Sequence, residues 1–190
     1  MQLSIVAKTL GLLLMVFSFA QVPPILVDLI YSEGEYLTFV FSFILTVFGG
    51  LVLWWPFRAI KKSFRLREGV LIVVSFWIVL SLFGTLPFLI TESISNLSFS
   101  NAFFESMSGL TTTGATVLSQ LDDLPKSILF YRQQLQWLGG MGIIVLAVAV
   151  LPLLGVGGME LYHAESSGIA KDRLTPKLRN TAIALWKIYL

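Results

Sequence analysis

Uninterrupted apolar runs of about twenty residues recur along this chain and limit its possible folds more than any other feature. Helices of that length cross a hydrocarbon core of about 30 Å and satisfy their own backbone polar groups. A soluble fold is excluded because 56% of the residues are hydrophobic and only 13% are charged. The sequence therefore predicts an all-α membrane protein, with spans at residues 9–30, 36–57, 69–90 and 131–154.

The charged residues between these spans predict the orientation. The loop after the first span carries Glu33 and Glu35, whereas Lys and Arg gather at residues 58–67 and 171–179. Because basic loops remain in the cytoplasm, we expect both ends of the four-span core to be cytoplasmic. The formal net charge of +2 is too small to indicate nucleic-acid binding, and without cysteine there is no disulfide framework or thiolate metal site.

Between the third and fourth spans lies a helical stretch that is too short to cross. Its apolar residues recur with helical spacing at Phe99, Phe103, Met107 and Leu110, and Ser98 is a suitable N-cap. A helix over residues 99–110 reaches ~18 Å, about half the bilayer, so the chain must return. Non-helical backbone at that depth is tolerated only where it is buried in protein or lines a water-filled cavity. This pattern predicts a re-entrant loop and a pore; the alternative is an interfacial amphipathic helix followed by an ordinary Thr/Gly turn.

The returning segment has the chemistry of a site for a dehydrated monovalent cation. Backbone carbonyls and hydroxyls replace a hydration shell without adding charge, and this segment offers both at Thr111, Thr112, Thr113 and Gly114. The carbonyl end of the half-length helix adds a partial negative charge. We expect Gly109 to end that helix and Gly114 to supply the backbone freedom that an inward-facing carbonyl requires.

Three acids lie near this segment. Glu105 is the only acid within the half-length helix, where a charge is functional by default. Two roles are open for it: a bond to neighbouring backbone or to Arg132, or a direct contribution to the field that the cation feels. Asp122 and Asp123 follow on the outer side, where they either concentrate cations at a pore mouth or form a solvated turn.

Enzymatic chemistry is not indicated. The single histidine, His163, does not make a metal site, and the predicted topology places it across the bilayer from Ser106 and Ser108, which excludes a Ser–His hydrolase. The glycines between residues 155 and 158 lack the spacing of a dinucleotide loop. We expect no cofactor and no catalysis.

Two sequence blocks resemble a known family. Residues 101–115, NAFFESMSGLTTTGA, and residues 136–145, QWLGGMGIIV, are similar to the Trk/Ktr/HKT superfamily of potassium transport proteins. The likeness extends across essentially the whole chain. The first two predicted spans resemble the extra N-terminal hairpin of the bacterial TrkH family, which the shorter KtrB proteins typically lack.

The resemblance implies four fused repeats around one pore, in a fold of the potassium-channel type. Each repeat consists of an outer helix, a half-helix with a filter loop, and an inner helix. Carbonyls at Thr111, Thr112, Thr113 and Gly114 would form one quarter of a potassium filter, with the ion at Thr111 and Thr112 and support from Glu105, Gly109 and Arg132. The implied divisions are an N-terminal transmembrane hairpin (1–57), a basic cytoplasmic loop (58–68), a first pore repeat (69–158), and a cytoplasmic segment with the start of the next repeat (159–190).

The resemblance also implies the setting. We expect a bacterial inner-membrane protein that takes up potassium, forms a homodimer at full length, and binds a nucleotide-binding TrkA-type regulatory subunit through the basic loop or the tail after Gly158. Residues 181–190 begin another hydrophobic run, so we expect a longer protein. The alternative function is a non-conducting four-helix membrane scaffold with an interfacial helix.

Overall fold

The computed structural model describes residues 3–60, 66–94 and 96–150, and beyond these only residues 184, 187 and 189. Residues 1–137 form one compact unit and residues 138–190 a second. The elements of the described residues are all helical, which confirms the predicted fold class. His163, the glycines at 155–158, the basic tail and much of the basic loop lie outside the described residues.

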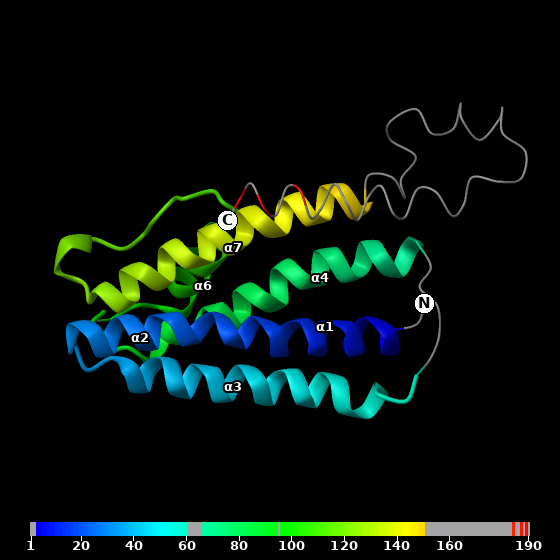
Figure 1. The fold of residues 1–190 in the computed structure, drawn as a ribbon, viewed down its shortest axis with the longest axis horizontal. Coiled ribbons are helices and arrows are strands. Elements are labelled where there is room, and N and C mark those ends of the chain that lie inside the picture. Colours follow the sequence, from blue (N-terminus) through cyan, green and yellow to red (C-terminus); the bar gives the residue numbers. More distant parts are fainter. Residues whose placement is uncertain are drawn as a thin grey trace, which may run out of the picture. The chain divides into compact units, whose positions relative to one another are not determined.

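The chain begins with a helical hairpin. Helix α1 (Leu3–Ser18), the 3₁₀ turn η1 (Phe19–Gln21) and α2 (Val22–Tyr31) follow one another as a continuous rod, and α3 (Tyr36–Trp54) with η2 (Trp55–Phe57) returns beside it (Figure 1). Prolines stand in the first turn of α2, where their missing amides cost least. The rod therefore continues as helix through Pro23 and Pro24.

Glycines bring the two helices of the hairpin together. A Cβ atom on Gly11 would lie 2.6 Å from the carbonyl oxygen of Gly50 and 2.7 Å from the amide nitrogen of Trp54. Only glycine fits where backbones approach this closely, as is common between helices in membranes. Deeper in the same interface, the buried Gln21 donates from Nε2 to Thr46 Oγ1 at 3.0 Å.

The remaining elements pack onto this hairpin. Helix α4 (Leu66–Gly84) lies against α1, and the short α5 (Leu86–Ile90) contacts α3. The half-length helix α6 (Phe99–Leu110) packs on α4 and is followed by an extended segment, the 3₁₀ turn η3 (Leu121–Asp123) and α7 (Lys126–Val150).

Three helical segments of the described residues are long and apolar enough to span a membrane: Leu3–Tyr31, Tyr36–Phe57 and Gly69–Ile90. The second and third have the predicted bounds, and the first contains the predicted span 9–30 but begins six residues earlier. The fourth, residues 131–154, is not among them; it starts within α7, and residues 151–154 lie outside the described residues. That span therefore stays a prediction.

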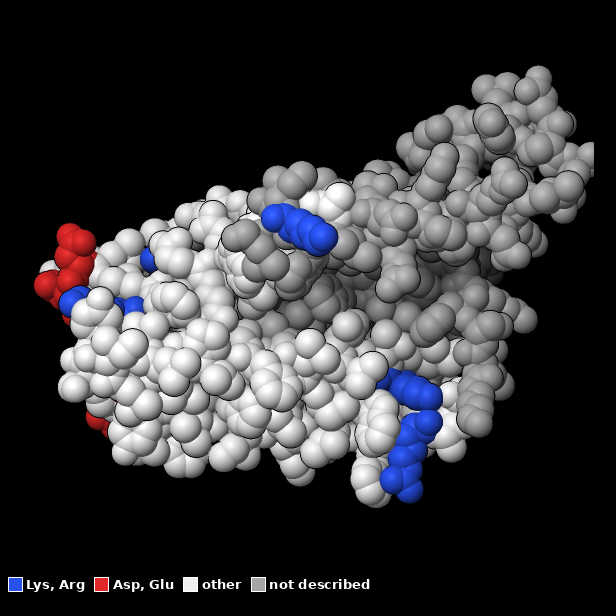
Figure 2. Space-filling view, in the orientation of Figure 1, with Lys and Arg blue, Asp and Glu red and all other residues white. Residues whose placement is uncertain are grey.

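Charge is distributed unevenly along the helices. Exposed acidic side chains gather at one end of the described helices (Figure 2), where η3 carries the exposed Asp122 and Asp123. At the other end, Lys8 donates from Nζ to the carbonyl oxygens of Arg58 and Ile60 at 3.0 and 2.7 Å, and the Arg58 guanidinium lies 4.1 Å from the centre of the Trp55 ring. Lys8 thus satisfies carbonyls that follow η2, at the end of the second rod of the hairpin.

Candidate functional site: a half-length helix and its returning loop

The half-length helix matches its prediction at both ends. It runs from Phe99 to Leu110, and the Ser98 hydroxyl accepts a 3.2 Å hydrogen bond from the Asn101 amide as an N-cap. Its buried face is formed mainly by small and polar residues, including Ala102, Glu105 and Ser106, rather than by phenylalanine. Phe99 and Phe103 instead stack on each other, with ring centres 6.2 Å apart.

The end of α6 corrects one expectation. Gly109 does not terminate the helix, which continues through Leu110, and the left-handed residue that follows is Thr112, with φ at 58°. Gly109 instead lies close to α7: a Cβ atom there would be 3.1 Å from Cβ of Leu135, a tighter contact than is usual. The glycine therefore serves close packing of α6 against α7.

Backbone amides of the returning loop fold back onto the end of α6. Thr111 donates to the carbonyl oxygen of Met107 at 2.8 Å, and Thr112 donates to that of Gly109 at 2.9 Å. The next two amides, of Thr113 and Gly114, both donate to the Ser108 carbonyl oxygen, at 2.9 and 3.3 Å. Successive amides that converge on one oxygen form a concave nest.

The carbonyls of the same four residues have no partner in the part of the chain that the structure describes. The carbonyl oxygens of Thr111, Thr112, Thr113 and Gly114 accept no hydrogen bond from any residue that the structure describes. Thr113 and Gly114 are exposed. A loop whose amides are used and whose carbonyls are free presents oxygen to its surroundings, and oxygen attracts cations.

Two positive φ angles produce this arrangement. Thr112 has φ at 58° and Gly114 at 72°. Gly114 adopts its value freely, as expected from the sequence, whereas a β-branched residue such as Thr112 is strained there. Strain of about 1–3 kcal/mol persists only where the surroundings hold the backbone in place, and such strain concentrates at functional sites.

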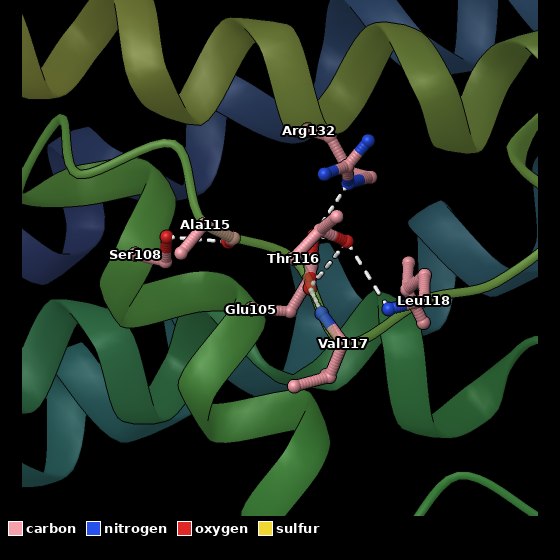
Figure 3. A network of polar contacts seen from close by, with 7 residues as sticks. All are labelled: Glu105, Ser108, Ala115, Thr116, Val117, Leu118 and Arg132. Atoms are coloured by element: carbon pink, nitrogen blue, oxygen red, sulfur yellow. Dashed lines mark hydrogen bonds and ion pairs between the residues drawn. The ribbon is translucent and has the colours of Figure 1, made fainter.

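A buried ion pair holds the next part of the loop (Figure 3). Glu105 is 4% exposed and accepts a 2.6 Å bond from Arg132 Nε in α7. Its carboxylate also accepts from the Thr116 hydroxyl, at 3.0 and 3.1 Å, and from the Val117 amide at 3.1 Å. One side chain thus joins α6, the loop and α7, which confirms the first of the two roles considered for Glu105.

Two hydroxyls complete the local structure. Ser108 donates from Oγ to the carbonyl oxygen of Ala115 at 2.6 Å, and the hydroxyl oxygens of Thr111 and Thr113 are 2.9 Å apart. A small recess opens between α6, the loop and α7, and is lined in part by Glu105, Gly114, Arg132 and Gln136.

The structure brings together most of the residues singled out from the sequence. Glu105, Gly109, Gly114 and Arg132 line one recess, whereas Asp122 and Asp123 are exposed in η3. Sequence reasoning missed Ser108, Thr116 and the Val117 amide. A hydroxyl two residues before the helix end is the only signal that Ser108 gave, and a backbone amide gives none.

Fold and site together define a helical membrane protein in which a half-length helix turns back as a carbonyl-bearing loop. The chain belongs to the TrkH family, whose description is "Cation transport protein" and whose model matches residues 37–190.

Curated relatives agree with this family. The chain is 54% identical to the Trk system potassium uptake protein TrkH of Vibrio parahaemolyticus, over all of this chain and 39% of the relative. It is 54% identical to TrkH and 42% identical to TrkG of Escherichia coli K12, over 97% of this chain and 38% of each relative. The chain thus spans about two fifths of the length of the curated relatives it matches.

A solved structure has the same fold. The crystal structure of the potassium transporter TrkH from Vibrio parahaemolyticus superposes on the chain with a TM-score of 0.79 at 50% sequence identity. The match covers all of this chain and 37% of that one.

Proposed function

We propose that this chain takes part in potassium uptake across the bacterial inner membrane and contributes one quarter of a selectivity filter. The observation that carries the proposal is the set of free carbonyl oxygens at Thr111, Thr112, Thr113 and Gly114, whose amides are all bonded to α6. Four carbonyls from each of four repeats would replace the hydration shell of the ion. The bound potassium would lie nearest Thr111 and Thr112.

The packing of α6 supports this function over that of a non-conducting scaffold. An interfacial helix turns its apolar face to lipid and its polar face to water. Helix α6 instead buries Glu105, Ser106 and Ser108 within the protein. Burial of polar residues, with the paired Glu105 among them, is what a re-entrant element inside a membrane protein requires.

The same proposal covers the larger organisation. Residues 69–158 act as the first pore repeat and residues 1–57 as an N-terminal hairpin, with both ends of the four-span core in the cytoplasm. Lys8 and Arg58 at one end of the hairpin, opposite Glu33 and Glu35, support this orientation. A homodimer at full length and a TrkA-type nucleotide-binding subunit on the cytoplasmic face complete the assembly.

The test is a charge placed in the loop. In a potassium-uptake-deficient cell that carries the full-length protein, Gly114→Asp should lower rubidium uptake at least tenfold without loss of membrane insertion. The reason is twofold: a side chain is strained at φ 72°, and a carboxylate there binds the ion too tightly to release it. Gly69→Asp is the matched control, since a Cβ at Gly69 would have no described residue beyond its own stretch of α4 within 4 Å. Unaltered uptake by Gly114→Asp would overturn the filter assignment.

A further inference from the structure

The loop that joins α2 to α3 contacts the pore repeat far along the sequence. Glu33, half-buried in this loop, accepts hydrogen bonds from the amides of Lys126 at 2.9 Å and Ser127 at 3.2 Å. These amides belong to the first turn of α7, where no helical partner is available. A carboxylate in that position satisfies two donors and complements the positive end of the helix dipole.

Two neighbouring acids bind the same region. The buried Asp28 accepts from the amides of Glu35 and Tyr36 at 2.9 Å each, at the start of α3, and from the Ser127 hydroxyl at 3.3 Å. Glu35, also buried, accepts from Thr91 Oγ1 at 2.7 Å, just after the end of α5. The end of α2 and the loop after it are therefore hydrogen-bonded to both ends of the segment that contains α6 and the candidate filter.

Contacts of two aromatic rings, Tyr131 and Tyr31, also hold α7 in place. Tyr131 is fully buried, with its ring 5.7 Å from that of Phe39 in α3 and 5.4 Å from that of Phe88 in α5. Its hydroxyl donates to the Gly84 carbonyl oxygen at 3.0 Å. The Lys126 ammonium lies 3.9 Å from the centre of the Tyr31 ring. The first part of α7 is thus fixed to the hairpin through Phe39 and Tyr31, and to α4 and α5 as well.

A short series of bonds connects Glu33 to the returning loop that follows α6. Glu33 fixes the start of α7, and α7 carries Arg132, which pairs with Glu105. Glu105 in turn holds Thr116 and Val117 on the returning loop. A helix is stiff because its backbone is hydrogen-bonded, so a shift at one end is transmitted along it. The position of α7 along its own axis therefore sets the position of the Arg132–Glu105 ion pair.

We infer that Glu33 is a positioning residue through which the N-terminal hairpin fixes the candidate filter, by way of α7 and the Arg132–Glu105 pair. The inference rests on the proposed function. It assigns the hairpin a role beyond membrane anchoring: removal of the Glu33 carboxylate displaces carbonyl oxygens that contact the ion, although Glu33 itself touches neither the loop nor the ion.

The experiment compares variants of the full-length protein in a potassium-uptake-deficient cell. For Glu33→Ala we expect the KM for rubidium uptake to rise roughly three- to tenfold, the loss expected when a helix loses its capping group, and the rubidium-to-sodium uptake ratio to fall. Glu33→Gln keeps one acceptor oxygen and should have an intermediate effect. Glu92→Ala is the matched control, since Glu92 is exposed at the same end and bonds to no described residue.

The readouts separate positioning from mere stability. A residue that only stabilises the fold changes the amount of active protein, hence the maximal rate, and leaves KM and the uptake ratio unchanged; that result for Glu33→Ala would overturn the inference. If Glu33→Ala does not reach the membrane, the isosteric Glu33→Gln decides by the same criterion. Should Gly114→Asp transport normally, the proposed function fails; should it be inactive while Glu33 variants keep their KM, only the present inference fails.

Discussion

Replacing Glu105 with alanine removes three bonds at once. The carboxylate, 2% exposed in its side chain, would no longer pair with Arg132, and the Thr116 hydroxyl and Val117 amide would lose their acceptor. Arg132 is itself only 14% exposed, so it would remain as an uncompensated, largely buried charge. Removal of one partner from a buried pair costs about 3–5 kcal/mol. At 1.4 kcal/mol per factor of ten, the ordered loop would lose roughly a hundredfold or more against displaced forms.

Rubidium uptake by the full-length protein measures this loss, with the protein in the membrane fraction quantified in parallel. We expect Glu105→Ala and Arg132→Ala each to lower uptake per molecule at least tenfold. A double variant, Glu105→Gln with Arg132→Gln, removes both charges and keeps hydrogen-bonding side chains, so it should lose far less than the two single changes multiplied. If the single losses simply multiply, or if Glu105→Ala transports at the normal rate, the ion pair does not hold the loop.

Two further predictions concern close packing. Gly11→Ala should lower the thermal unfolding midpoint of the purified full-length protein, because the added Cβ would meet backbone atoms of Gly50 and Trp54 and overpacking costs about 1–3 kcal/mol. The control Gly69→Ala, in open space, should leave the midpoint unchanged. Equal midpoints for the two variants would refute the reasoning. Gly109→Val should lower rubidium uptake several-fold more than it lowers the midpoint, because it pushes α6 away from α7 beside the loop; a fall in the midpoint alone, with normal uptake, would contradict this.

The fold was largely predictable because lipid leaves few choices. Apolar runs at residues 9–30, 36–57 and 69–90 must be helices, and three helices that are long and apolar enough to span a membrane lie there. The half-length helix was equally predictable, since Ser98 is a clear N-cap and residues 99–110 are periodic. Contacts between helices were not predictable: Gly11 meets Gly50 because of a register that no local pattern encodes.

The candidate site was predictable in its residue types and less so in its geometry. A Thr-Thr-Thr-Gly segment after a half-length helix indicates free oxygens, and Gly114 does adopt a positive φ. The strain at Thr112 was not foreseeable, because its β-branched side chain disfavours that conformation and only the surrounding bonds impose it. Nor does sequence spacing show that Glu105 bonds the Val117 amide, since twelve residues separate them.

The partners of the loop's polar groups are the physical basis for the proposed affinity of this loop for a cation. Backbone at membrane depth must be satisfied by protein or by the contents of a cavity. Here the amides of Thr113 and Gly114 are bonded to Ser108, and that of Val117 is bonded to Glu105. The carbonyls of residues 111–114 remain unsatisfied by any described residue. The groups without a partner are therefore carbonyl oxygens, which carry a partial negative charge. Each unsatisfied polar group in an apolar setting costs several kcal/mol. A monovalent cation relieves that cost at several oxygens together, which an anion would not do.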